Sequence, residues 1–197
     1  MKDKKEVKKS SSPDVDLEYD PTTFVGEFNP TAFIDYEKRF EELNGVKLDP
    51  SYVRHISQNY GGIPKKQCFK TRKGTTLRLG RFLNYLDRES VEPPIRKSWN
   101  GHGDDIRLDW SVHRIIDPLD YFPPHLHPFA SLYMGPHHPD EMVEFDLLCF
   151  DYSKSGRPKI VVWYHDESKF SDKPVKEKVA DTFDEFLSML YEYKETN

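Results

Sequence analysis

The stretch VADTFDEFLSMLYEY (residues 179–193) decides the fold, because it joins a helix start signal to a single apolar stripe. Thr182 precedes Glu185 by three residues, the spacing of a capping box, in which a hydroxyl and a carboxylate each accept a backbone N–H at the helix start. Asp181 is the alternative cap. Large apolar side chains then recur at three- and four-residue spacing, at Phe183, Phe186, Leu187 and Leu190. We therefore expect an amphipathic helix that docks on a sheet.

The residues before this helix predict strands of that sheet. MVEFDLLCFDY (residues 142–152) and KIVVWYHDES (residues 159–168) are apolar strand patterns separated by a turn around Gly156, which favours an antiparallel hairpin. The later half of the first strand has Leu147 and Cys149 on one face and Leu148 and Phe150 on the other. Because both faces are apolar there, this strand is expected in the interior of the sheet.

The N-terminal half predicts two helices joined by a short link. Asn29 and Pro30 give a cap followed by a first-turn proline, and Gly45 ends the helix that they start. Asp49 and Pro50 repeat the signal, and the second helix ends at residues 61–62, which are both glycine. The expected buried positions are Phe33, Tyr36, Phe40 and Leu43 in the first helix and Tyr52, Val53, Ile56 and Tyr60 in the second.

The middle of the chain contains further strand patterns. QCFKT (67–71) and TTLRLGRFLNYL (75–86) predict a hairpin, although the spacing of Phe82, Tyr85 and Leu86 also suits the start of a short helix. Residues 88–124 are irregular and rich in proline and glycine, with short strands expected around residues 106–110. LHPFA (126–130) predicts another strand. The order favours an α+β fold: an antiparallel sheet of about five or six strands, packed by an N-terminal helix pair and a C-terminal helix.

Length and composition favour a single domain. The chain has 197 residues, and 13 Phe, 11 Tyr and 3 Trp supply an aromatic-rich core. Residues 1–23 are rich in lysine and serine and poor in apolar groups, so we expect a disordered tail there and one domain over residues 24–197.

The charge and cysteine content restrict the class of partner and the location. The net charge is −5, although the first nine residues contain five lysines. An acidic body disfavours direct binding of nucleic acid and favours basic partners. Cys68 and Cys149 are far apart and match no disulfide scaffold or zinc ribbon. Neither a membrane span nor a signal peptide is recognisable in the sequence, so a cytoplasmic location is expected.

No pattern in the chain predicts catalysis. It lacks a phosphate-binding glycine loop, a dinucleotide fingerprint, a nucleophile elbow and a zinc-protease helix motif. Four histidines, His125, His127, His137 and His138, are the one candidate metal-binding group, but prolines around the first pair disfavour the strand geometry that would let both chelate from one face. We predict no catalytic residue, no metal site and no cofactor.

Two acidic segments receive structural rather than catalytic interpretations. His165, Asp166 and Glu167 are expected at the end of a strand, where polar residues are common. GHGDD (residues 101–105) is expected to be a solvated turn between Trp99 and Trp110. Exposed tryptophans there would suit a protein interface better than catalysis, and burial of both rings is the alternative.

Several segments, taken in chain order, resemble the SUKH superfamily, which includes fungal regulators of cell-wall assembly and many bacterial immunity proteins. LDPSYVRHISQNYGGIP (48–64) is similar to the entry motif of the family, FLNYL (82–86) to its short apolar segment, and HPFA (127–130) to the strand before its hairpin. FDLLCFDYSKSGRPKIVVWYHDES (145–168) resembles the family hairpin, and VADTFDEFL (179–187) its final helix motif. The matching positions are Leu48, Pro50, Tyr52, Gly61 and Gly62 in the first motif and Asp151, Gly156, Trp163, His165 and Glu167 in the hairpin. SLYMGPHHPDEMVE (131–144) departs from the pattern, because the family often has a compact glycine-rich segment there.

The resemblance implies an α+β fold without a cofactor that works by binding another protein. For bacterial members, it implies an immunity protein that neutralises a secreted or contact-delivered toxin, often a nuclease. The acidic charge agrees with a basic toxin as partner, because opposite charges accelerate encounter. The expected anchors are aromatic and acidic loop residues: Trp99, Asp104, Asp105, Tyr133, Asp140 and Glu141. The alternatives are a regulatory scaffold that binds endogenous proteins and a metal-dependent hydrolase that uses the four histidines.

Overall fold

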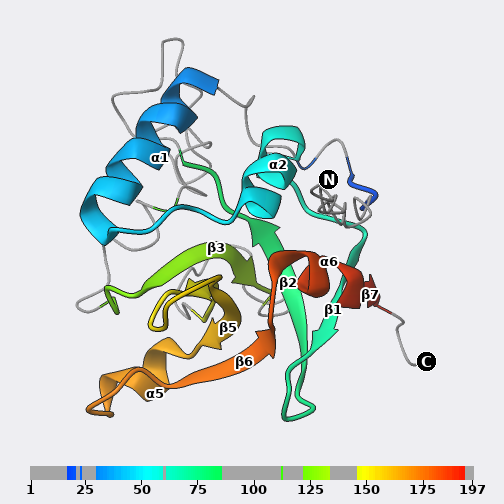
Figure 1. Cartoon of the computed structure of the whole chain (residues 1–197). Helices are drawn as coiled ribbons and strands as arrows, with labels where there is room; N and C mark the ends of the chain where they lie inside the picture. The colour runs from blue at the N-terminus through cyan, green and yellow to red at the C-terminus, as the bar shows by residue number, and fades with distance from the viewer. Residues whose placement is uncertain are drawn as a thin grey trace, which may run out of the picture.

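A curled antiparallel sheet forms the centre of the computed structural model, which describes residues 17–20, 23, 30–59, 61–85, 112, 122–133 and 146–193 (Figure 1). Within these residues the sheet has seven strands in the order β6-β5-β4-β3-β2-β1-β7, and every neighbouring pair is antiparallel. The strands are β1 (Lys66–Lys70), β2 (Thr76–Phe82), β3 (Leu126–Leu132), β4 (Leu147–Asp151), β5 (Lys159–Trp163), β6 (Lys176–Ala180) and β7 (Tyr191–Glu192). The α+β prediction is thus confirmed.

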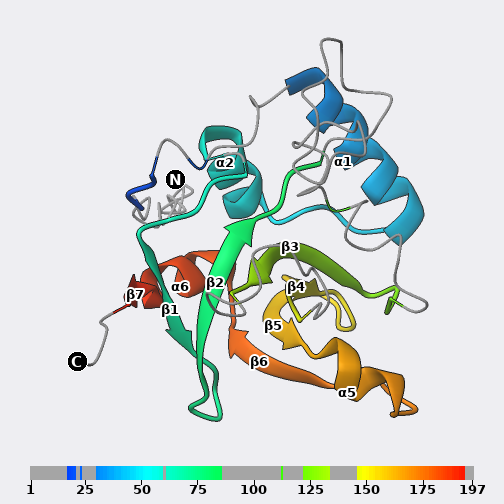
Figure 2. The same ribbon diagram turned by 180° about the vertical axis from the view of Figure 1, so that it is seen from behind.

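Four helices accompany the sheet in the described part of the chain: α1 (Pro30–Asn44), α2 (Pro50–Gln58), α5 (His165–Lys169) and α6 (Phe183–Met189). The two N-terminal helices lie together on one side of the sheet, whereas α5 lies at the opposite end of the molecule (Figures 1 and 2). Asp49 caps α2 as predicted, because its carboxylate accepts the backbone N–H groups of Ser51 at 2.9 Å and Tyr52 at 3.4 Å. Gly45 follows α1 with a φ of 66°, a conformation that favours glycine.

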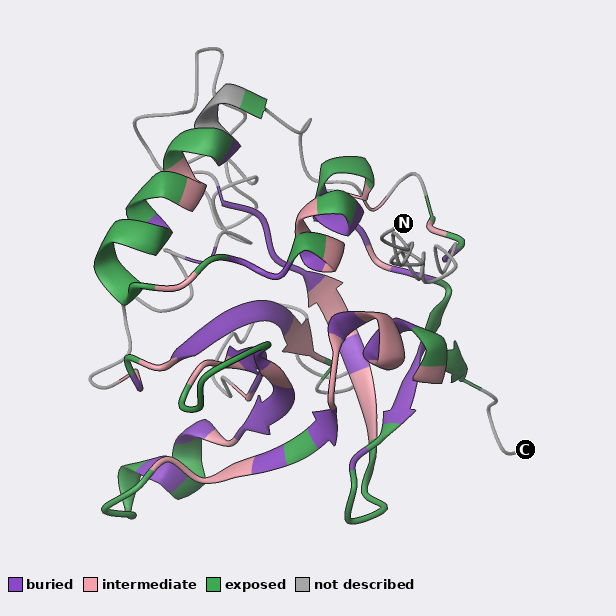
Figure 3. Cartoon of the chain, in the orientation of Figure 1, coloured by how far each residue is buried: buried purple, intermediate pink, exposed green. Residues whose placement is uncertain are grey.

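The core is a cluster of aromatic rings between the helices and the sheet. The ring of Tyr52 on α2 lies 5.9 Å from Phe129 on β3, 5.0 Å from Phe150 on β4 and 5.2 Å from Phe183 on α6, measured between centroids. Figure 3 shows this buried layer running along β3 and through the facing sides of α2 and α6. One buried tyrosine therefore joins two helices to two interior strands, as expected from the aromatic-rich composition.

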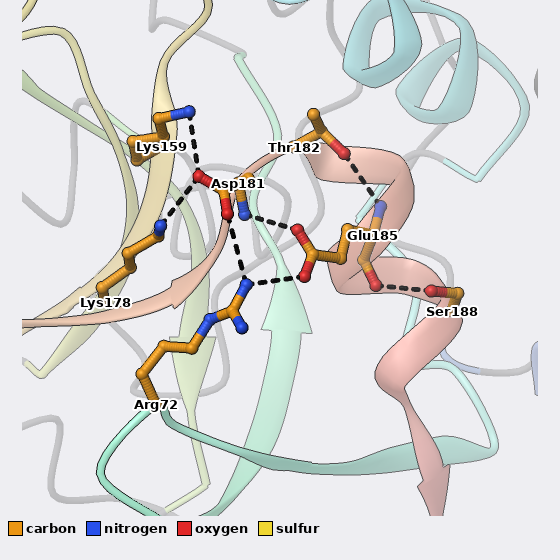
Figure 4. A network of polar contacts seen from close by, with 7 residues as sticks. All are labelled: Arg72, Lys159, Lys178, Asp181, Thr182, Glu185 and Ser188. Atoms are coloured by element: carbon orange, nitrogen blue, oxygen red, sulfur yellow. Dashed lines mark hydrogen bonds and ion pairs between the residues drawn. The ribbon is translucent and has the colours of Figure 1, made fainter.

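The start of α6 confirms Thr182 as its cap and adds a charged network (Figure 4). Thr182 Oγ1 accepts the backbone N–H of Glu185 at 3.1 Å, as a capping box requires. The Glu185 carboxylate instead accepts the N–H of Asp181, one residue earlier than the motif specifies, at 2.7 Å. Asp181 binds Lys178 Nζ at 2.7 Å and Lys159 Nζ at 2.9 Å, and these lysines lower the pKa of its carboxyl to about 2.

Part of the C-terminal prediction was wrong. The strand expected over residues 159–168 ends at Trp163, and His165–Lys169 form the short helix α5. Helix α6 ends at Met189, earlier than expected, and residues 191–192 form β7 instead; residues 179–180, which precede the Thr182 cap, belong to β6. Strand β6 was not predicted at all, since Lys176, Glu177 and Lys178 conceal any apolar alternation.

The buried carboxylate of Glu177 links β6 to the β1–β2 turn. Glu177 Oε1 accepts the backbone N–H of Lys73 at 3.1 Å, and Oε2 accepts the hydroxyl of Tyr164 at 3.1 Å. Beside it, the backbone N–H of Arg72 donates to the carbonyl of Lys178 at 2.9 Å. Burial opposes ionisation of Glu177, but hydrogen bonds from Thr71 and from the other donors outweigh it and keep the pKa of this carboxyl below its ordinary value.

The predicted hairpins are confirmed. Strands β1 and β2 pair with Phe69 opposite Leu77, and β4 and β5 pair with Cys149 opposite Val161. Phe82 is the last residue of β2, opposite Ala130, so the strand interpretation of this residue holds and the helical alternative fails. None of the helices in the described ranges is long and apolar enough to cross a membrane.

Two findings concern the N-terminal half of the chain. Leu43, predicted on the buried face of α1, is 85% exposed. Before position 24, Leu17 is buried, and the residues near it contact the domain: Tyr19 forms a bridge with Pro64, and the backbone N–H of Lys65 donates to the carbonyl of Glu18. The packed part of the chain thus includes residues that precede position 24.

Candidate protein-interaction surface

An arginine in contact with two exposed tyrosines marks one side of the sheet. The guanidinium carbon of Arg78 lies 4.1 Å from the ring centroid of Tyr133 and 4.9 Å from that of Tyr193. Tyr133 is 40% exposed and Tyr193 is 55% exposed. Gln67 Oε1 accepts from Arg78 Nε at 2.9 Å and from Nη2 at 2.7 Å, so the planar head is held in one orientation. We call Gln67, Arg78, Tyr133, Tyr191 and Tyr193 the Arg78 surface.

Strand pairing brings these residues together from four segments. Arg78 is in β2, and Tyr133 follows β3, with its backbone N–H donating to the Arg78 carbonyl at 2.8 Å. Gln67 is in β1, which pairs with β7 through Cys68 opposite Tyr191. Tyr193 follows β7 directly. The sheet order therefore places side chains that are up to 126 positions apart, Gln67 and Tyr193, around one guanidinium.

The segment that carries Arg78 is strongly basic. Residues 65–81 contain four lysines and three arginines and no acidic residue, so the rest of the chain has a net charge of −12. Some of these charges are engaged: Lys65 Nζ binds Glu18 at 2.8 Å, and Arg72 binds Glu185 at 2.8 Å. Lys66 and Lys70, at the two ends of β1, have exposed side chains. The Arg78 surface therefore lies beside a locally cationic strand of an acidic protein.

A cavity of about 270 Å³ lies where the end of α1 meets β3. Tyr36 Oη lies 3.0 Å from His127 Nε2, and Lys176 Nζ lies 3.2 Å from His125 Nε2. Burial and the Lys176 ammonium both lower the pKa of His125, so this ring favours its neutral form. The cavity is lined by Phe40, Leu43, Asn44, Val46, Pro124, His125, Leu126, His127 and Tyr152.

His125 and His127, the two described histidines of the candidate metal-binding group, contact different residues. His127 packs against Phe40 and Tyr85 on the helix side, whereas His125 is next to the ion pair between Lys176 and Asp151. Among the residues that the structure describes, no three His, Cys, Asp or Glu side chains are grouped so that they could hold a metal ion. The other two histidines, at positions 137 and 138, lie outside the described residues.

His165 has a structural setting, although not at the end of a strand as predicted. It is the first residue of α5, where its backbone N–H donates to Asp146 Oδ1 at 2.9 Å. Its ring is buried edge-on against Trp163, with centroids 5.4 Å apart, and Nδ1 lies 3.2 Å from Asp166 Oδ1. The packing of its ring on Trp163 and its position at the start of α5 give His165 a structural role.

Only one of the six predicted interface residues falls within the described part of the chain. Tyr133 belongs to the Arg78 surface. Trp99, Asp104, Asp105, Asp140 and Glu141 lie outside the described residues. Sequence reasoning missed Arg78 and Tyr193, although the absence of acidic residues over positions 65–81 was a visible signal for the first of them.

The chain was compared with known proteins. It matches the SMI1 / KNR4 family (SUKH-1) over residues 35–189, which is more than half of its length. The matched range contains α2, α6 and strands β1 to β6, together with Arg78 and Tyr133, whereas Tyr191 and Tyr193 follow it. Searches of curated proteins and of solved structures found no match.

Proposed function

Because the chain belongs to the SMI1 / KNR4 family (SUKH-1), we propose that it acts without catalysis, by binding another protein. The family and the α+β fold agree with the expectations from the sequence. The partner is bound in a stoichiometric complex, without turnover of a substrate.

The observation that carries this proposal is the Arg78 surface. Tyrosine and arginine are the residue types that most often dominate the energy of protein interfaces, because each combines a large contact area with a polar group. Arg78 is already oriented by Gln67 and by two rings, so less side-chain freedom is lost on binding. A preorganised aromatic and cationic cluster on the surface is well suited to a protein partner.

Within this class, we propose the role of an immunity protein that neutralises a toxin such as a nuclease, acting in the cytoplasm. The protein blocks the toxin by covering its active site or a neighbouring surface. The net charge of −5 supports a partner with a basic surface, because opposite net charges accelerate the encounter even where the contact itself is local.

Co-expression with the product of the adjacent gene tests this role. We expect the two proteins to copurify as a stable complex and cells that express the adjacent toxin gene to survive only when this chain is present. Tyr133→Ala should reduce survival, whereas Phe170→Ala, which removes a 91% exposed aromatic ring next to α5, should not. Capture of housekeeping proteins by the wild-type chain, without protection from toxicity, would instead favour the regulatory scaffold.

A further inference from the structure

We propose that Arg78 recognises a carboxylate group of the protein partner, so that the partner presents an acidic side chain or chain terminus to the Arg78 surface. This inference rests on the proposed function and specifies the chemistry of its contact. Its basis is the geometry of one guanidinium and the charge of the strands around it.

Gln67 accepts hydrogen bonds from only some of the N–H donors of the Arg78 guanidinium. The guanidinium carries five N–H groups, and Gln67 accepts one from Nε and one from Nη2. No described residue accepts from Nη1, so both N–H groups of this nitrogen and the second N–H of Nη2 remain available. Two such donors in one plane match the two oxygens of a carboxylate, which is the geometry of a bidentate pair.

The two tyrosine rings make this site selective for a planar anion. Tyr133 and Tyr193 pack against the guanidinium, with their ring centroids 4.1 Å and 4.9 Å from its carbon, and Gln67 binds one edge of it, so that a planar anion can pair with the remaining edge. A lysine at position 78 would keep the positive charge but lose the fork, the contact with Gln67 and the stacking area. Arg78→Lys therefore tests the shape of the guanidinium group while the positive charge is kept.

The surrounding charges favour an acidic occupant. Lys66 and Lys70 are exposed on β1, and no acidic residue occurs over positions 65–81. The closest acidic residue in the strand register is Glu192, which lies opposite Lys66 on β7. Charge complementarity thus directs a carboxylate to Arg78.

Nucleic acid is the competing anion, and the observations favour protein. Binding to a phosphate backbone relies on many cationic contacts at once, whereas the rest of this chain carries a net charge of −12 and repels a polyanion. A single oriented arginine between tyrosines is suited instead to one carboxylate in an otherwise mixed interface.

Fluorescence anisotropy with three labelled probes tests the proposal: a peptide of four Gly-Glu repeats, the same peptide with Gln in place of Glu, and a twelve-nucleotide oligothymidylate. We expect the Glu peptide to bind more tightly than the Gln peptide and the oligonucleotide, and the Arg78 Nε–H signal to shift in NMR titrations. Arg78→Lys should weaken binding of the Glu peptide by about 10-fold, which is the loss of one charge-assisted contact. Arg157→Lys, a matched change in the exposed β4–β5 turn, should have no effect.

Several results would overturn the proposal. These are no binding of the Glu peptide at millimolar concentration, tighter binding of the oligonucleotide, or equal losses for Arg78→Lys and Arg157→Lys. Thermal melts of both variants show whether the fold is intact. If the product of the adjacent gene binds wild type and Arg78→Lys equally, the carboxylate contact is refuted while the proposed function stands. If it does not bind at all, the proposed function fails whatever the peptides do.

Discussion

Replacing the buried carboxylate of Glu177 tests how strongly this side chain stabilises the contact between β6 and the β1–β2 turn. Glu177→Gln keeps the shape of the side chain but removes its charge. The amide oxygen can still accept the Lys73 N–H, whereas the amide N–H₂ then faces the Tyr164 hydroxyl, which must change from donor to acceptor. Hydrogen bonds to a charged group contribute about 1.5–3 kcal/mol and neutral ones about 0.5–1.5 kcal/mol. Burying an amide costs less than burying a carboxylate, which offsets part of the loss. We therefore expect the free energy of unfolding at pH 7 to fall by about 1–2 kcal/mol.

Acid should remove this difference, because the pKa of Glu177 is lowered in the folded state. A lowered pKa contributes stability that is fully present above the unfolded value of 4.5 and is lost as the pH falls through the folded value. Wild type should therefore lose its advantage over Glu177→Gln below pH 4.5. Urea unfolding followed by tryptophan fluorescence at pH 7 and at acid pH measures both quantities, with Glu42→Gln, an exposed residue of α1, as the control. Equal stability of wild type and Glu177→Gln at pH 7, or a difference that does not change with pH, would refute the role of this carboxylate.

Three further changes probe the helix, the core and the cysteines. Thr182→Ala should cost about 1 kcal/mol in urea unfolding, since it removes the cap of α6, and Ser188→Ala on the exposed side of that helix should cost clearly less. Phe183→Ala should cost about 3–5 kcal/mol, because the ring is buried among six other aromatic rings, and a loss below about 1 kcal/mol would contradict the described core. Burial raises the pKa of the Cys68 and Cys149 thiols, so both should resist an aromatic disulfide reagent in the native protein and react in denaturant; rapid native reaction would show that they are accessible.

The elements that the sequence predicted are those whose signals are local. Asp49 with Pro50, and Thr182 with Glu185, set helix starts through hydrogen bonds within three residues, and the structure has both. The hairpin around Gly156 is similarly local, since this glycine has a φ of 100° in the turn.

The elements that the sequence missed depend on distant residues. Strand β6 reads as charged because it lies at one end of the sheet, and its buried Glu177 is satisfied by the β1–β2 turn roughly a hundred positions earlier in the chain. The sequence predicts strand at the position of helix α5, because His165 follows an apolar run, yet Asp166 and Glu167 are acidic residues that suit the first turn of a helix. Neither outcome follows from spacing alone.

The sequence predicted only one residue of the candidate site, because the other residues are brought together by strand pairing. Tyr133 was chosen as an aromatic residue in a loop, and this residue does contact Arg78. The sequence pattern predicts only strand positions for Arg78 and Gln67, and only the end of a helix for Tyr193. Their juxtaposition requires the register of β1 with β2 and with β7, which composition and periodicity do not contain.

Calorimetric titration of the purified chain with the purified product of the adjacent gene tests most directly whether this protein works by binding another protein. We expect saturable binding at a ratio of one to one, at least about 10-fold weaker for Tyr133→Ala and unchanged for Phe170→Ala. Absence of heat at micromolar concentrations, or equal affinity of wild type and Tyr133→Ala, would contradict it.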